Sequence, residues 1–122
     1  MEKIVFIEDE TTLQKMLTVA LTEVGYSVVA ASDGEAGLAA VRTEKPNLVL
    51  LDLILPKMDG FTVLSEIKKD EAIAHTPVIV LTNLESAEDV EKVVALGATT
   101  YLVKANYDLP DIVAKVKEIL EK

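Results

Sequence analysis

Polar and charged side chains follow four short apolar runs of this 122-residue chain, at the point where each run ends. The first such run leads into the acidic triplet Glu8-Asp9-Glu10, and a later one leads into Asp52, which interrupts an otherwise apolar stretch. Two further runs end in Thr82 and Lys104. Carboxylates bind hard cations, while hydroxyl and ammonium groups stabilise anionic oxygens. These positions are therefore the candidates for chemistry.

The apolar runs themselves have the pattern of buried strands. They are short, do not alternate with polar residues and are rich in β-branched residues, which suits strands covered on both faces. The five expected strands are residues 4–7, 28–31, 48–51, 78–81 and 101–103.

Longer segments with helical spacing lie between and after these strands. Apolar residues recur at three- and four-residue intervals along residues 13–24 and again along 112–120. Gly25 and Gly97 are suited to end the first and fourth helices, and Ser86 is suited to cap the fourth. Five strands alternating with five helices predict an α/β fold, a doubly wound (βα)₅ parallel sheet, as one domain over residues 1–122.

Composition narrows the classes of partner. The net charge of −9 argues against binding to nucleic-acid phosphates and against adsorption to anionic membranes. No cysteine is present, so disulfide and thiolate chemistry are excluded. No apolar run approaches the roughly 20 residues of a spanning helix, and the first residues lack the pattern of a signal peptide. We therefore expect a cytoplasmic protein.

The fold predicts where the acids meet. In doubly wound sheets, ligands bind at the carboxyl ends of the strands, so Glu8, Asp9 and Asp52 should converge there. Two like charges about 4 Å apart repel by roughly 4 kcal/mol at an effective dielectric of about 20. The single ammonium of Lys104 cannot offset several such pairs, so a divalent cation is expected. An all-oxygen ligand set favours Mg²⁺, with Mn²⁺ as the alternative, over zinc.

At these residues the chain resembles the receiver domain of bacterial response regulators, the CheY-like family. The resemblance runs from Ile4 to about Leu120 and includes the specific pattern D-x-x-L-P-x-M-D-G, which begins at Asp52. Its other markers are Glu8-Asp9, Thr82, Gly97-Ala98 and the run from Tyr101 to Lys104. The resemblance implies a flavodoxin-like sheet of strand order 2-1-3-4-5.

The resemblance also implies a mechanism. Asp52 is the expected acceptor of a phosphoryl group from a sensor histidine kinase or a phosphotransfer protein, in a Mg²⁺-dependent reaction. The implied metal ligands are Glu8, Asp9, Asp52 and the backbone carbonyl of Ile54. Lys104 and the Thr82 hydroxyl would stabilise the phosphoryl oxygens. The domain would then be a phosphorylated switch that catalyses only its own phosphorylation and dephosphorylation.

The same resemblance implies how the switch is transmitted. Thr82 would move toward the phosphoryl group and Tyr101 would fill the space it leaves. The changed surface would be the fourth helix, fifth strand and fifth helix, where a downstream target, still unidentified, or a second phosphorylated copy would bind. Ile54 and Leu84 flank the expected path of the hydrolytic water, and their apolar side chains predict slow loss of the phosphoryl group.

Three residues depart from the family pattern. Glu8 stands where Asp is usual, and its additional methylene group changes the reach of the carboxylate. Asn83 stands where a small residue is common. Ala105 stands where the family usually has proline, often after a cis bond. A cis bond before alanine costs ~3–4 kcal/mol, and the sequence leaves the cis and trans alternatives open.

Three other functions share parts of this pattern. A flavodoxin-like cofactor binder needs a phosphate-binding loop after the first strand, where Glu8-Asp9-Glu10 would repel phosphate. A metal-dependent phosphatase needs an acid two residues after the nucleophile, and Ile54 stands there. A receiver-like interaction module that signals without phosphorylation remains the alternative reading.

Overall fold

The computed structural model describes residues 1–121 and contains one five-stranded parallel sheet of order β2-β1-β3-β4-β5. The strands are β1 (Lys3–Ile7), β2 (Ser27–Ala31), β3 (Leu48–Leu51), β4 (Val78–Thr82) and β5 (Thr100–Val103). The helices are α1 (Thr11–Glu23), α2 (Gly34–Glu44), α3 (Gly60–Lys69), α4 (Ala87–Ala95) and α5 (Leu109–Leu120), with a 3₁₀ turn η1 (Lys104–Asn106). The α/β class and the predicted strand order are confirmed.

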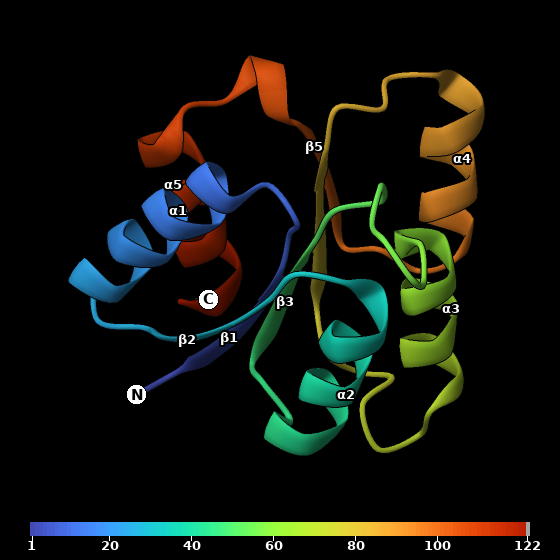
Figure 1. Ribbon diagram of the computed structural model, residues 1–122, viewed down its shortest axis with the longest axis horizontal. Coiled ribbons are helices and arrows are strands. Elements are labelled where there is room, and N and C mark those ends of the chain that lie inside the picture. The colour runs from blue at the N-terminus through green and yellow to red at the C-terminus, as the bar shows by residue number, and fades with distance from the viewer. Residues whose placement is uncertain (122) are drawn as a thin grey trace.

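Helices cover both faces of the sheet, which is why its central strands are apolar throughout. Figure 1 shows α1 and α5 on one face and α2, α3 and α4 on the other. Successive residues of a strand point to opposite faces. Accordingly, Val5 and Ile7 belong to the core under α2 and α3, whereas Ile4 and Phe6 belong to the core under α1 and α5. All four residues are fully buried, so β1 contributes to the cores on both faces of the sheet.

Strand register brings two of the candidate acids together. Ile7 of β1 pairs with Leu51 of β3, so Glu8 and Asp52 leave the sheet side by side. The amide of Asp52 donates a hydrogen bond to the carbonyl of Ile7 over 3.1 Å, which extends the ladder by one step beyond the assigned strand. The backbone therefore sets the position of the acids before their side chains interact.

Helix boundaries follow the sequence signals. Ser86 caps α4 by accepting a hydrogen bond from the amide of Asp89, and Asp108 and Asp111 form a capping box at the start of α5. Gly25 and Gly97 have φ values of 103° and 99°, a conformation that side chains other than glycine rarely adopt.

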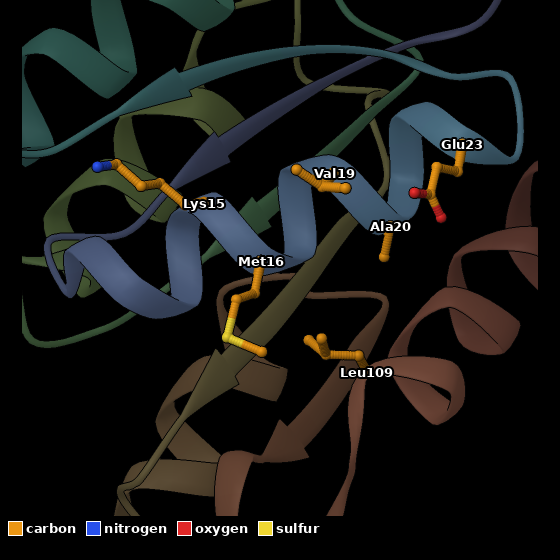
Figure 2. Close-up of a pocket in the computed structure, with 6 residues that line it drawn as sticks. All are labelled: Lys15, Met16, Val19, Ala20, Glu23 and Leu109. Carbon is orange, nitrogen blue, oxygen red and sulfur yellow. The ribbon is translucent and has the colours of Figure 1, made fainter.

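The buried face of α1 is narrower than the apolar stripe in its sequence suggests. Leu17 and Leu21 are buried, but Met16 is 51% exposed and Val24 is 43% exposed. Met16 lines a shallow apolar groove between α1 and the start of α5, and Figure 2 shows it facing Leu109 across that groove. The stripe on α1 thus divides into a core-facing part and a solvent-facing part.

The bond between Lys104 and Ala105 is trans, since residues 1–121 contain no cis peptide bond. In the same part of the chain, no helix has the length and hydropathy needed to cross a membrane.

Candidate functional site

Lys104 joins the two buried acids at the carboxyl edge of the sheet. Its Nζ lies 2.7 Å from Oε1 of Glu8 and 3.0 Å from Oδ2 of Asp52. The side chain of Glu8 is 1% exposed and that of Asp52 is 6% exposed, so water screens these pairs poorly. Glu8 follows β1, Asp52 follows β3 and Lys104 opens the turn after β5, so three separate loops form this arrangement.

Asp9 adds a third carboxylate. Glu8, Asp9 and Asp52 each offer an oxygen, and these oxygens lie within 4.8 Å of one another. Asp9 is exposed and the other two are buried, so the cluster has one side open to solvent. The sequence prediction that these three acids converge is confirmed as geometry.

This cluster contains three carboxyl groups but only one ammonium group, that of Lys104. Burial raises the pKa of the Glu8 carboxyl to about 7, although the bond to Lys104 opposes this shift. Burial by itself would lower the pKa of Lys104, but Glu8 and Asp52 together raise that pKa above its ordinary value. The ammonium of Lys104 is thus held in its charged form, while burial shifts the Glu8 carboxyl toward its protonated form. The site has more negative charge than its own lysine can neutralise.

A hard cation suits this donor set. Oε1 of Glu8 is buried, and its contact with Lys104 is an ion pair without a well-oriented hydrogen bond. Three carboxylates with an open side match the oxygen ligands and retained waters of Mg²⁺. The residues present therefore fit a divalent metal ion, which would offset the repulsion among the acids.

Thr82 and Tyr101 lie on β4 and β5, the two strands that follow β3 across the sheet. Thr82 ends β4 and is fully buried. The hydroxyl of Tyr101 donates to the carbonyl oxygen of Leu84 over 2.7 Å, so the ring is turned toward the loop that follows Thr82. Burial, and then the charges of Asp89 and Asp52, raise the pKa of Tyr101, which keeps its hydroxyl protonated and able to donate.

The loop after Asp52 is shaped by a close backbone approach. A Cβ on Gly60 would lie 2.3 Å from the carbonyl oxygen of Asp52, so only glycine fits there. The amide of Ile54 donates to Oδ1 of Asp52 over 3.3 Å, and the Ile54 side chain is 58% exposed. Leu84, on the neighbouring loop, is half-buried and packs against the core. Ile54 and Leu84 thus differ in exposure, although both follow a site residue by two positions.

Two of the departures from the family pattern lie at the surface. Asn83 is exposed beside Thr82, and Ala105 is exposed after its trans bond.

Gln14, which the sequence pattern did not single out, contacts the loop that carries Glu8 and Asp9. A lone glutamine in an amphipathic helix has no distinctive spacing, so only the coordinates could reveal this contact.

The doubly wound sheet has acids, a hydroxyl and an ammonium group at its carboxyl edge, which is where sheets of this kind bind their ligands. Residues 4–117 match the profile of the response regulator receiver domain. The chain therefore belongs to the response regulator receiver family, a class of signalling domains.

Individual relatives agree with this assignment. The probable transcriptional regulator ycf27 of Porphyridium aerugineum is 37% identical over 121 residues, which are 99% of this chain and 49% of that protein. The chain thus spans about half the length of the curated relatives it matches. The phosphorylated cyanobacterial phytochrome response regulator RcpA superposes with a TM-score of 0.88 at 32% identity, covering 99% of this chain and 94% of RcpA. The Mn²⁺-bound form of the response regulator Rcp1 superposes with a TM-score of 0.81 at 32% identity, covering 98% and 91%.

Proposed function

We propose that Asp52 is the phosphoryl acceptor of this receiver domain. The observation that carries the proposal is the position of its carboxylate, nearly buried, 3.0 Å from the ammonium of Lys104 and within 4.8 Å of two further acids. One oxygen of Asp52 attacks phosphorus, an O–P bond forms and the N–P bond of a phosphohistidine breaks. The leaving imidazole nitrogen keeps the electron pair and takes up a proton. The product is an acyl phosphate.

The surrounding groups supply the charge balance that this transfer requires. Most of the barrier to phosphoryl transfer comes from positioning and from charge on the transferred oxygens. Lys104 moves from its pair with Asp52 to a phosphoryl oxygen, and the hydroxyl of Thr82 donates to another. Neither residue changes its protonation state.

The metal ligands in this proposal are Glu8, Asp9, Asp52 and the backbone carbonyl of Ile54. Mg²⁺ bound there would neutralise charge on the phosphoryl oxygens, and Mn²⁺ could replace it. The acidic cluster supports this assignment, as does the Mn²⁺-bound form of the similar regulator Rcp1. Glu8 reaches Lys104 directly, so its additional methylene places the carboxylate against the lysine.

The proposed switch couples Thr82 to Tyr101. Both residues border the loop between β4 and α4, and the Tyr101 hydroxyl already binds the carbonyl of Leu84 within it. When Thr82 turns toward the phosphoryl group, the loop and Tyr101 settle in a new arrangement. The surface that changes is that of α4, β5 and α5, where a target or a second copy would bind.

The phosphodonor in this proposal is a histidine kinase or a phosphotransfer protein. Lys104 and Glu10 form one end of an apolar depression that continues past Met16 and Leu109 into the groove of Figure 2. An apolar surface that begins at the acceptor site suits a helical protein carrying phosphohistidine. Because the curated relatives are transcriptional regulators, we propose that the output is control of transcription, exerted outside this chain.

A small phosphodonor and intact-mass measurement test the acceptor function. With Mg²⁺ the protein should gain the mass of one phosphoryl group, and chelation of Mg²⁺ or the variant Asp52→Ala should prevent the gain. A wild-type protein that remains unmodified would favour the alternative, a receiver-like module that signals without phosphorylation.

A further inference from the structure

Gln14 of α1 connects three backbone segments at the carboxyl edge of the sheet. Its Nε2 lies 2.7 Å from the carbonyl oxygen of Glu8, 3.2 Å from that of Ala31 and 3.3 Å from the hydroxyl of Ser32. Glu8 begins the loop after β1, and Ala31 ends β2. A single half-buried amide group thus ties the first helix to two loops of the site.

The contact with Glu8 acts on the loop that carries the acids. Only Glu8, Asp9 and Glu10 separate β1 from α1. The amide of Glu8 donates to the carbonyl of Ala31 over 2.9 Å, and the amide of Glu10 donates to Oε2 of Glu8 over 3.1 Å. The carbonyl of Glu8 is held by Gln14. The peptide plane between Glu8 and Asp9 is therefore held at its carbonyl group by Gln14, and the peptides before and after it are held through their amides. The orientation of this plane helps to set the direction in which the Asp9 side chain leaves the chain.

We propose that Gln14 is a positioning residue for the metal site: its amide group orients the Glu8–Asp9 peptide so that the two carboxylates face Asp52. This inference rests on the proposed function of the acidic cluster. Gln14 does not touch the three carboxylates in this role and acts only through the backbone of Glu8.

The chemistry of a glutamine amide suits this task. Its nitrogen carries two N–H donors and no charge, and it faces two carbonyl oxygens and a hydroxyl oxygen. A lysine or arginine could also donate, but would place a positive charge beside a site meant for a cation. The side chain of Glu10, the residue before α1, makes no capping hydrogen bond. The side chain of Gln14 instead connects α1 to the preceding loop, through its bond to the carbonyl of Glu8.

The test is binding of Mn²⁺, followed by electron paramagnetic resonance, without any phosphodonor. Gln14→Met keeps the length of the side chain and removes both donors. We expect its Mn²⁺ affinity to fall about tenfold, the lower end of the range for lost outer contacts of metal sites. Gln14→Glu also removes the donors but adds a negative charge. Positioning predicts weaker binding by this variant as well, whereas a purely electrostatic effect predicts tighter binding.

Thr22→Val is the matched control. The Thr22 hydroxyl donates to the carbonyl of Thr18 over 2.7 Å in the same helix, so this variant also loses one donor to a carbonyl, but far from the acids. Its Mn²⁺ affinity should equal that of the wild type. Thermal melts of all variants in chelator separate a loss of fold from a loss of the site.

The outcomes separate the two proposals. If the wild type binds Mn²⁺ and both Gln14 variants bind it equally well, Gln14 has no positioning role, although the metal site stands. If the Thr22 control weakens binding as much as the Gln14 variants do, the effect is general to the helix and the inference is wrong. A wild type that binds no Mn²⁺ would overturn the metal site and the role of Gln14 together.

Discussion

The hydroxyl of Tyr101 donates a hydrogen bond to the carbonyl oxygen of Leu84, 2.7 Å away. This bond joins β5 to the loop between β4 and α4, and Thr82 lies at the start of that loop. The side chain proposed to report phosphorylation is therefore already bound to the segment that would move. Any motion of the loop must either carry Tyr101 along or break this bond.

We predict that Tyr101→Phe loosens this loop without preventing phosphorylation. The variant removes one partly buried hydrogen bond, whose loss typically costs about 1 kcal/mol. Amide hydrogen exchange along residues 83–86 should become faster, while intact mass still shows the phosphoryl group with a small phosphodonor. Tyr107→Phe, a tyrosine that packs against the other core, should leave the exchange of this loop unchanged. Equal exchange in the wild type and Tyr101→Phe would contradict the coupling.

Apolar side chains at Ile54 and Leu84 predict a long-lived phosphoryl group. Ile54→Asn should shorten the lifetime by about tenfold or more, since a group that positions or deprotonates water is typically worth at least that much. Ile54 is exposed, so the substitution costs little stability. Leu84→Glu should act in the same direction, with some loss of packing. The measurement is decay of the phosphorylated mass, with Val19→Glu as an exposed apolar control, and unchanged lifetimes in both variants would refute the prediction.

Mg²⁺ should stabilise the folded protein through Asp9. A ligand that binds only the folded state at a concentration about a hundredfold above its Kd adds ~2.7 kcal/mol to the unfolding free energy. Asp9→Asn should lose most of this gain, and its metal-free form should be slightly more stable because one repulsive charge is gone. Glu10→Gln, an exposed acid outside the cluster, should keep the gain. Thermal melts with and without Mg²⁺ check this, and a full gain in Asp9→Asn would remove that residue from the site.

We predict that deprotonation of Tyr26 lowers the unfolding free energy at alkaline pH. Burial and a hydrogen bond to Glu121 raise the pKa of its phenol to about 12 from an ordinary value of 10.0. Because the folded state holds this proton more tightly than the unfolded state, the stabilisation is complete below pH 10.0 and declines as the pH rises to about 12. Urea unfolding across that window should show a smaller decline for Tyr26→Phe than for the wild type. Parallel declines would rule out this contribution.

Much of the fold could be predicted because its signals are local. Strands such as 48–51 are apolar runs, and Ser86 and Gly97 have the residue types that their positions demand. The meeting of Glu8 with Asp52 followed from parallel strands that end at one edge of the sheet. The exposure of Met16 did not follow, because periodicity cannot tell how wide a stripe its neighbours cover.

Other features of the site depend on geometry that no pattern encodes. The trans bond at Ala105 and the bond from Tyr101 to Leu84 depend on the packing of whole loops. Gln14 escaped notice because its partners are backbone carbonyls, which every residue provides. The roles assigned to Thr82 and Tyr101 came from resemblance to the receiver family and stay predictions.

The carboxylate of Asp52 is the one group proposed to take the phosphoryl group. Borohydride reduces an acyl phosphate to an alcohol, so a phosphorylated aspartate becomes homoserine, which peptide sequencing by mass spectrometry can locate. After treatment with a small phosphodonor and Mg²⁺, we predict homoserine at position 52 and at no other acid. Homoserine at position 9, or 5-hydroxynorvaline (the reduced form of glutamate) at position 8, would contradict this assignment. A phosphorylated protein that yields no reduced acid at all would contradict it too.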